Sequence, residues 1–183
     1  MKIDTVVVGP LETNCYLLRN EKSILIVDPG SDFKKIKQAV GNDNVVGILL
    51  THTHFDHVGA LEECKNEYDV PVYKKENLEE KEYNIEVFDF DVIFTPGHTN
   101  DSVIFYFKNE NILFTGDFIF KGSIGRTDLG GNMNDMNKSF FKLFSLAQTN
   151  QSIAIYPGHG QCTNLNDELC KNPFLQIPGN PKL

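Results

Sequence analysis

The stretch that decides how this chain is read is His52-Thr53-His54-Phe55-Asp56-His57. It follows Val45–Thr51, an apolar run typical of a strand buried on both faces. In an extended loop, residues two apart point the same way, so His52 and His54 can bind one ion together. Asp56 and His57 lie at the turn into the next helix and point towards a neighbouring position. The stretch therefore predicts two adjacent metal positions.

Two more histidines and one aspartate also come directly after apolar strands. His98 lies in Thr95-Pro96-Gly97-His98-Thr99, Asp117 in Thr115-Gly116-Asp117, and His159 in Pro157-Gly158-His159-Gly160. If these strands share a sheet, their ends bring the loops to one rim. A lone histidine beside a strand is more often structural than a ligand, but all five histidines of the chain occupy such loops.

The predicted ligands form two sites that share a bridging carboxylate. The first site consists of His52, His54 and His98, and the second site of Asp56, His57 and His159. Asp117 is assigned as the bridge between them. Imidazole and carboxylate groups suit zinc or iron, and the lack of a thiolate argues against a closed structural zinc site. The sequence therefore predicts two divalent metal ions, zinc in the first place, with iron or manganese as alternatives.

Composition limits the remaining choices. The 183 residues are 40% hydrophobic and 23% charged, as expected for one globular domain over residues 1–183. A net charge of -8 repels phosphate backbones and disfavours nucleic acid as a partner. No stretch reads as an export signal or membrane span, and the four cysteines form no CxxC pair. We therefore expect a cytoplasmic protein with reduced thiols and no membrane partner.

The chain interleaves strands and helices. We expect strands at Thr5–Val8, Cys15–Leu18, Ser23–Val27, Val45–Thr51, Val70–Tyr73, Ile85–Thr95, Ser102–Lys108, Ile112–Thr115 and Ser152–Tyr156. We expect helices at Asp32–Val40, Val58–Glu67, Lys74–Glu82, Lys138–Ala147 and Leu165–Lys171. Consecutive strands in both halves are not a simple βαβ alternation, and they indicate an α/β fold with two sheets and helices outside.

These motifs together resemble the metallo-β-lactamase superfamily, and within it the glyoxalase II-like (hydroxyacylglutathione hydrolase-like) branch. The matching stretches are Thr13–Leu17, Val27–Gly30, and the motifs at 52–57, 95–99, 116–117 and 157–160. The resemblance implies a four-layer αββα sandwich, with two mixed β-sheets flanked by helices and the metal site at the rim between the sheets.

The chain departs from typical glyoxalase II in one respect. Members of that branch carry a C-terminal helical domain that supplies much of the glutathione contact, whereas only 24 residues follow His159 here (183 − 159). The stretches Gly122–Asp128 and Asn172-Pro173-Phe174 resemble shorter, single-domain relatives. We therefore expect no helical glutathione-binding domain, which leaves the thiol part of the substrate open.

The chemistry expected from the metals is hydrolysis of a small-molecule acyl thioester such as S-lactoylglutathione, by attack of metal-bound hydroxide. A thiol has a pKa near about 8.5, so a thiolate can leave without a proton donor, and all five histidines are already assigned. Asp56 is the predicted catalytic residue, because it can orient the hydroxide as well as bind metal. Lactones and other activated esters are the next choice.

Two further questions stay open in the sequence. Arg126 follows Asp117 in a glycine-rich loop and is the candidate for binding an anionic substrate, although it can equally form a surface ion pair with Asp128. An oxidoreductase is the alternative function, since persulfide dioxygenases resemble this family and use one iron at positions of the His52, His98 and Asp117 type.

Overall fold

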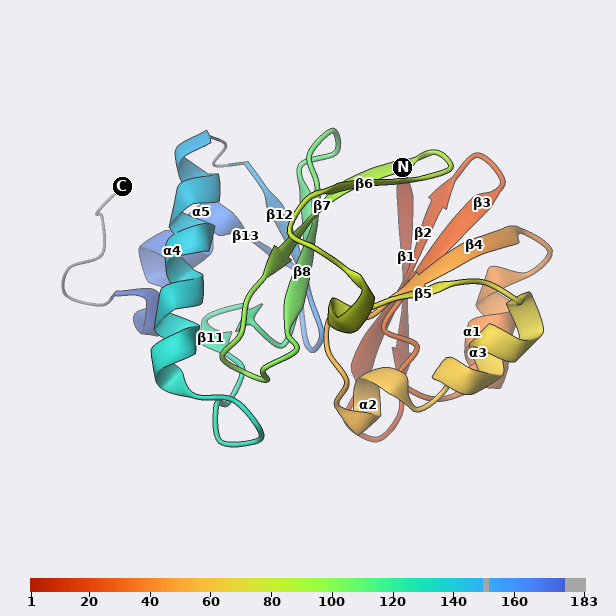
Figure 1. Ribbon diagram of the computed structural model, residues 1–183, viewed down its shortest axis with the longest axis horizontal. Helices are drawn as coiled ribbons and strands as arrows, with labels where there is room; N and C mark the ends of the chain where they lie inside the picture. The colour runs from red at the N-terminus through yellow and green to blue at the C-terminus, as the bar shows by residue number, and fades with distance from the viewer. Residues whose placement is uncertain (150–151, 177–183) are drawn as a thin grey trace.

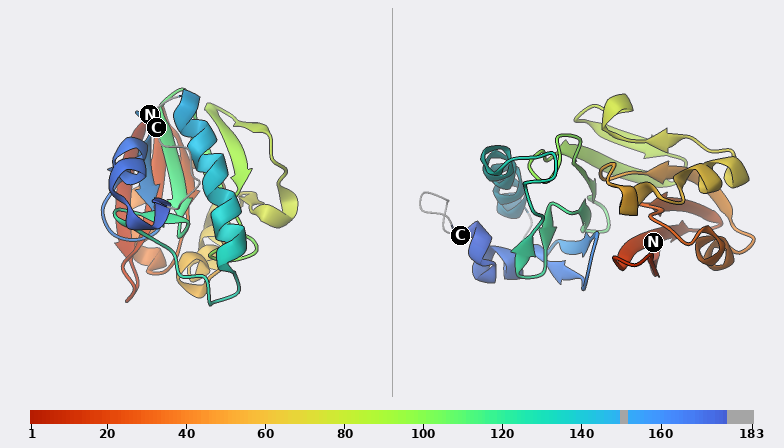
Figure 2. Two further views of the ribbon diagram at one scale, coloured as in Figure 1. Left: turned by 90° about the vertical axis from the view of Figure 1, so that its left-hand side faces the viewer. Right: turned by 90° about the horizontal axis from the view of Figure 1, so that it is seen from below.

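The structure is a computed structural model that describes residues 1–149 and 152–176. Two β-sheets lie face to face, and helices cover both outer faces (Figures 1 and 2). Each sheet contains both parallel and antiparallel strand pairs. The expected αββα sandwich of two mixed sheets is therefore confirmed.

The first sheet comes from the N-terminal part of the chain. Its strands, in spatial order, are β1 (Lys2–Val8), β2 (Thr13–Asn20), β3 (Ser23–Val27), β4 (Asn44–Leu49) and β5 (Val72–Tyr73). Strands β1 to β3 pair antiparallel, and β3 to β5 pair parallel. The helices of this half are α1 (Phe33–Val40), α2 (Phe55–Val58) and α3 (Leu61–Tyr68).

The second sheet comes from the C-terminal part. Its strands, in spatial order, are β13 (Thr163–Asn164), β12 (Ala154–Pro157), β9 (Ile112–Gly116), β8 (Val103–Phe107), β7 (Phe88–Phe94) and β6 (Glu82–Ile85). Helices α4 (Met133–Thr149) and α5 (Leu165–Lys171) cover its outer face (Figure 1). The short hairpin of β10 (Ile119–Phe120) and β11 (Ser123–Ile124), and the 3₁₀ turn η2 (Pro173–Leu175), lie beside these helices.

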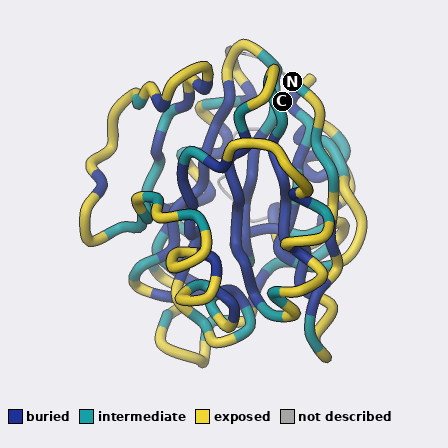
Figure 3. The backbone as a smooth tube through the Cα atoms, turned by 90° about the vertical axis from the view of Figure 1, so that its right-hand side faces the viewer, coloured by how far each residue is buried: buried dark blue, intermediate teal, exposed yellow. Residues whose placement is uncertain are grey.

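Successive side chains of each strand point to opposite faces of its sheet, which creates one hydrophobic layer between the sheets and one on each outer face. In β3, Leu25 and Val27 face the opposite sheet, whereas Ile24 and Ile26 face the helices of the first half. The layer between the sheets is rich in phenylalanine, including Phe88, Phe90, Phe105, Phe107 and Phe114. Figure 3 shows the buried strands behind a more exposed shell of helices and loops.

Two expected elements were wrong. Lys74–Glu82 is not a helix: it forms only the 3₁₀ turn η1 (Lys75–Asn77) and then enters β6. The segment has no helical apolar face, since Leu78 is its single buried residue. Ile85–Thr95 is not one strand, because Glu86 adopts a positive φ of 52° and Ile85 pairs with Phe88 across a tight turn.

The other expected strands and helices are present, with ends displaced by a few residues. The helix expected at Val58–Glu67 begins three residues earlier and is interrupted at Gly59 and Ala60, which separate α2 from α3. Among the described residues, no helix combines the length and the apolar character needed to cross a membrane.

Candidate metal centre

The four loops that carry the predicted ligands meet because the strands before them end at one edge. Strands β7 and β9 are both antiparallel to β8, and β12 is parallel to β9, so all three run in one direction. Strand β4 of the first sheet reaches the same edge, where the amide of Val103 donates to the carbonyl oxygen of Thr51 (2.8 Å). The loops do share one rim, although their strands belong to two sheets and not to the single sheet that the prediction supposed.

All seven predicted ligands lie in this cluster. Three groups place their ligand atoms within 4.8 Å of one another: His52, His54 and His98; His52, His57 and Asp117; and Asp56, His57 and His159. We call the first group the trihistidine half-site and the third the aspartate half-site; Asp117 lies between them. Their roles as ligands stay a prediction, but their convergence is a feature of the fold.

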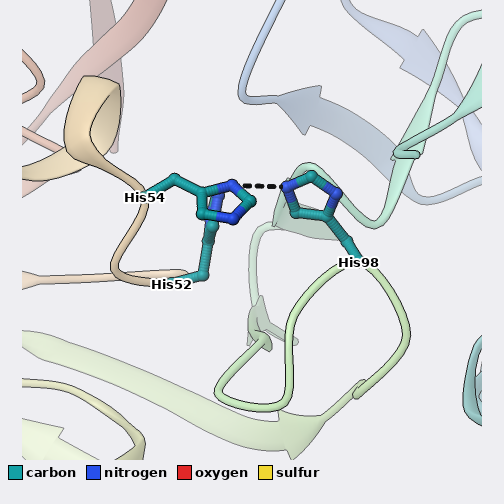
Figure 4. Close-up of side chains that lie close together, drawn as sticks. All are labelled: His52, His54 and His98. Atoms are coloured by element: carbon teal, nitrogen blue, oxygen red, sulfur yellow. Dashed lines mark hydrogen bonds between the residues drawn. The ribbon is translucent and has the colours of Figure 1, made fainter. Parts of the chain in front are cut away.

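In the trihistidine half-site, backbone carbonyls fix the orientation of two rings. Nδ1 of His98 lies 2.6 Å from the carbonyl oxygen of Arg126, and Nε2 of His54 lies 3.0 Å from that of Leu129. A carbonyl only accepts, so each of these nitrogens carries the proton and the other nitrogen offers a lone pair. Those two free nitrogens lie 2.9 Å apart. Figure 4 shows the two rings facing each other.

The third ring of this half-site, His52, is fixed through a threonine. Thr51 Oγ1 donates to Asp28 Oδ2 at 2.6 Å, which leaves the hydroxyl oxygen to accept a hydrogen bond from His52 Nδ1 at 3.1 Å. His52 Nε2 is then the unprotonated nitrogen, and it points into the cluster beside His54 and His98 (Figure 4). Three lone pairs therefore converge, which is the arrangement that a cation requires.

In the aspartate half-site, His57 is held by a buried carboxylate. His57 Nδ1 donates to Asp28 Oδ2 at 2.9 Å. Its Nε2 lies 3.3 Å from Asp117 Oδ1 and 3.6 Å from Asp56 Oδ2. Because Asp28 also accepts from Thr51, one carboxylate behind the centre orients a histidine of each half-site.

The other histidine of this half-site, His159, also donates from one ring nitrogen to an acceptor outside the centre. Its Nδ1 donates to the carbonyl oxygen of Leu11 at 3.0 Å, and its Nε2 lies 3.2 Å from Asp56 Oδ2. The hydroxyl of Thr13 donates to the same oxygen of Asp56 at 3.0 Å. All five histidines thus bond one nitrogen outward and direct the other to the centre.

The atoms of the centre fit a divalent cation. His52 Nε2, His57 Nε2 and Asp117 Oδ1 are buried and have no hydrogen-bond partner in the described part of the chain. Burying polar atoms without partners is costly, and native proteins avoid it. Imidazole nitrogens and carboxylate oxygens are ligands for zinc, iron and manganese, so a divalent metal ion satisfies these atoms.

Burial and charge give the buried groups different protonation preferences. Burial lowers the pKa of His52 well below its ordinary value, which keeps this ring neutral. Burial would also lower the pKa of His57, but the carboxylates of Asp28 and Asp117 raise it to about 10. Burial would raise the pKa of Asp117, yet the rings of His159 and His57, whose Nε2 atoms lie 3.5 and 3.3 Å from its oxygens, hold it below the usual range. The predicted bridge is therefore an anion.

A glycine permits the close approach of two loops. A side chain at Gly158 would place its Cβ 2.3 Å from Asp117 Oδ1 and 2.7 Å from Cε1 of His57. Any larger residue there would displace the predicted bridge. The glycine of the Pro157–Gly160 motif is therefore explained by space in the centre.

Asp28 is the site residue that the sequence analysis missed. Val27–Gly30 carries part of the resemblance to the family, but the sequence did not predict a role for Asp28 in the site. A signal was present, because this aspartate directly follows the apolar strand β3, as the other site residues follow theirs. Its side chain is 2% exposed, which a strand-end aspartate does not reach without buried partners.

An open cleft of about 610 Å³ leads to the centre. Its floor contains ligands of both half-sites, and its walls include Leu11, Phe55, Phe120 and Leu129. The volume lies within the range of small-molecule sites. The cleft therefore brings a small substrate to the predicted metal positions.

Arg126, the predicted substrate-binding residue, also lines this cleft. Its Nε and Nη2 donate to the two carboxylate oxygens of Asp128, both at 2.7 Å. The ion pair that the sequence left open is thus formed, on a surface where both side chains are more than half exposed. The role of Arg126 towards substrate stays a prediction.

The profile of the Metallo-beta-lactamase superfamily matches residues 8–82 and 74–159, which include every predicted metal ligand.

Two bacterial relatives align over nearly the whole chain. The "Probable metallo-hydrolase YqgX" of Bacillus subtilis is 35% identical, over 96% of this chain and 98% of its own. The "Hydroxyacylglutathione hydrolase GloC" of Haemophilus influenzae is 30% identical, also over 96% of this chain and 98% of its own.

Two solved structures share the fold. BLEG-1, described as a B3 metallo-beta-lactamase, superposes with a TM-score of 0.90 at 31% identity, covering 96% of this chain and 100% of its own. TTHA1623, solved in a di-iron-bound form, superposes with a TM-score of 0.84 at 32% identity, covering 94% of this chain and 100% of its own.

Proposed function

This chain belongs to the metallo-beta-lactamase superfamily, and from that premise we propose that it is a metal-dependent hydrolase of small acyl thioesters, with S-lactoylglutathione as the first substrate to test. The observation that carries the proposal is the convergence of seven ligand atoms whose lone pairs or charges all face one centre at the floor of a cleft. The GloC relative supports the thioester class, because its name describes hydrolysis of an acylated glutathione.

Two divalent ions are the proposed complement, one in each half-site, with Asp117 between them. Zinc is the first candidate, and the di-iron form of TTHA1623 makes iron the main competitor. When bound, such ions polarise a substrate carbonyl and lower the pKa of water. The protein contributes ligands that are already oriented by hydrogen bonds to their outward-facing atoms.

Asp56 is the proposed catalytic residue. Its Oδ2 accepts a hydrogen bond from Thr13 Oγ1 at 3.0 Å and lies 3.2 Å from His159 Nε2. The carboxylate also lines the cleft, so it reaches both the predicted metal position and the space where substrate enters. In the proposed reaction Asp56 would help to hold the metal ion of the aspartate half-site and would orient the attacking hydroxide.

The lack of a spare histidine supports a thioester over an amide. In the proposed metal-loaded centre every histidine is a ligand, so no ring is left to protonate a leaving amine. A thiolate leaves unprotonated near neutral pH because a thiol has a pKa near about 8.5. Lactones and other activated esters share this property and form the next class to assay.

The proposal is tested with the purified, metal-analysed protein. Zinc, iron and manganese contents are measured, and hydrolysis is followed for S-lactoylglutathione, other thioesters and a lactone series. We expect about two metal ions per chain and thioester hydrolysis that is lost on chelation and regained with metal. One iron per chain together with oxygen uptake on glutathione persulfide would instead establish the oxidoreductase alternative.

A further inference from the structure

The walls of the cleft are apolar at positions where a protein surface is ordinarily polar. The side chains of Leu11, Phe55 and Leu129 line it and are 51%, 72% and 49% exposed, respectively. They come from three separate segments: the turn between β1 and β2, the first residue of α2, and the loop before α4. Exposed apolar side chains that gather around a functional site indicate a ligand that covers them.

These side chains flank both halves of the centre. Leu11 is tied to the aspartate half-site through its carbonyl oxygen, which accepts from His159, and the ring of Phe120 lies 6.0 Å from the ring of His159. Leu129 is tied to the trihistidine half-site, because its carbonyl oxygen accepts from His54. A carbonyl held at the centre would therefore have apolar walls on either side of it.

Cationic groups are scarce at the same place. Arg126 is the single lysine or arginine among the residues that line the cleft, within the part of the chain that the structure describes. Both carboxylate oxygens of Asp128 already accept from its guanidinium. Glutathione conjugates carry two carboxylates and one ammonium group, so they are net anions, and the chain itself carries a net charge of -8. Among the described residues that line the cleft, the one lysine or arginine that could attract such an anion is already paired with Asp128.

From this combination we propose that the cleft selects uncharged thioesters with apolar groups on both sides of the thioester, in preference to glutathione thioesters. The inference rests on the proposed function and narrows it to a substrate class. Burying one methylene against apolar walls is worth about a threefold to fourfold gain in affinity or in kcat/KM. Selectivity is therefore expected to grow with acyl length until the cleft is filled.

The test compares thioesters that carry the same acyl group on two different thiols, one uncharged and one anionic. Acetyl, butyryl and hexanoyl thioesters of N-acetylcysteamine, which is uncharged, are assayed beside the same acyl thioesters of glutathione with the metal-loaded protein. We expect kcat/KM to be at least about tenfold higher for the N-acetylcysteamine series and to rise about threefold per methylene. Equal or better use of the glutathione series would overturn this inference and leave the hydrolase intact.

Failure of the proposed hydrolase function would give a different result from failure of the proposed selectivity. If no thioester of either series is cleaved by protein that is fully loaded with metal, the proposed function itself fails. A binding measurement then decides the selectivity separately: S-hexyl-N-acetylcysteamine and S-hexylglutathione, which cannot be hydrolysed, are titrated calorimetrically. Tighter binding of the uncharged thioether supports the apolar cleft, and tighter binding of S-hexylglutathione refutes it.

Variants of the walls supply the structural control. Phe55→Ala and Leu129→Ala should each lower the ratio of kcat/KM for the hexanoyl thioester to kcat/KM for the acetyl thioester by about threefold or more. Phe141 on α4 is 53% exposed but lies outside the cleft, so Phe141→Ala should keep the dependence of the parent protein. A flattened dependence in Phe141→Ala, or an unaltered one in both wall variants, would contradict the assignment.

The ion pair between Arg126 and Asp128 at the cleft predicts a change in the opposite direction, towards anionic thioesters. Asp128→Asn releases the guanidinium of Arg126, and the ratio of kcat/KM for glutathione to N-acetylcysteamine thioesters should rise by about twofold to fivefold, the scale of an exposed ion pair. Adding Arg126→Met to Asp128→Asn should abolish that gain. An unchanged ratio in Asp128→Asn would show that the pairing does not govern charge selectivity.

Discussion

The two half-sites fix their histidines by different means. In the trihistidine half-site, the outward nitrogens donate to the hydroxyl of Thr51 and to the backbone carbonyls of Arg126 and Leu129, so no charge lies directly behind the rings. In the aspartate half-site, His57 donates to the buried carboxylate of Asp28, and Asp56 is itself a predicted ligand. One half is thus neutral and held by the backbone, and the other is anionic.

This difference teaches where each half-site is vulnerable. The neutral half depends on the path of the loops that bring two carbonyl groups to the rings. The anionic half depends on the single side chain of Asp28, which also reaches the neutral half through Thr51. Charge and backbone geometry therefore make separate contributions that substitutions can distinguish.

Metal removal should have the largest effect, because buried atoms of both half-sites then have no partner. A metal present at about a thousand times its dissociation constant stabilises the fold by about 4 kcal/mol, and chelation should remove that stabilisation. Thermal unfolding with and without chelator measures it, and added zinc should restore the melting temperature. Equal melting temperatures would mean that metal does not bind the folded centre.

Asp56→Ala tests the catalytic residue of the anionic half. We expect turnover to fall by at least about 10²-fold, the scale of a lost transition-state stabiliser, with the fold retained. Thr53→Ala is the matched control, because Thr53 lies in the same loop but bonds to Asp101 outside the centre. Circular dichroism checks the fold, and near-normal turnover in Asp56→Ala would remove its assigned role.

Asp28→Asn and Thr51→Val separate the two halves. Substituting a residue that orients metal ligands typically weakens metal binding by about 10- to 100-fold. Asp28→Asn should weaken the binding of both metal ions, since Asp28 contacts His57 directly and His52 through Thr51. Thr51→Val should weaken mainly the binding of the ion at His52. Metal titrations against a chromophoric chelator would detect this, and identical effects of the two substitutions would break the comparison.

Glu168→Gln should have the smallest effect of these substitutions. It tests whether hydrogen bonds from α5 stabilise the loop that leads to the neutral half-site. The buried carboxylate of Glu168 on α5 accepts from the amide of Gly122 and from Asn172, whose side chain also donates to Ser123. These bonds hold the loop that leads to the carbonyl of Arg126. Loss of one acceptor should cost about 1–3 kcal/mol in the free energy of unfolding, measured in urea.

The control for that experiment is Glu62→Gln on α3, whose side chain is 74% exposed. Its free energy of unfolding should stay within about 0.5 kcal/mol of that of the parent protein. If Glu168→Gln behaved like Glu62→Gln, the bonds from α5 would not stabilise the loop.

The sequence predicted the strands around the site because their apolar runs are local patterns that need no partner to be read. Ser23–Val27 and Ile112–Thr115 are found almost as expected. Lys74–Glu82 failed because its path is decided by pairing of β6 with β7 and by the burial of Leu78, and neither is encoded in local periodicity. Charged residues in a row do not distinguish an exposed helix from an extended connection.

By itself, the sequence determined the seven candidate ligands of the centre, because each lies directly after an apolar strand; it did not reveal Asp28 behind them. Only the tertiary structure decided how those side chains are oriented. The pairing of His57 with Asp28, the carbonyl groups behind His54 and His98, and the apolar walls of the cleft join residues far apart in the chain. Such contacts depend on loop paths and strand register, which spacing along the sequence does not specify.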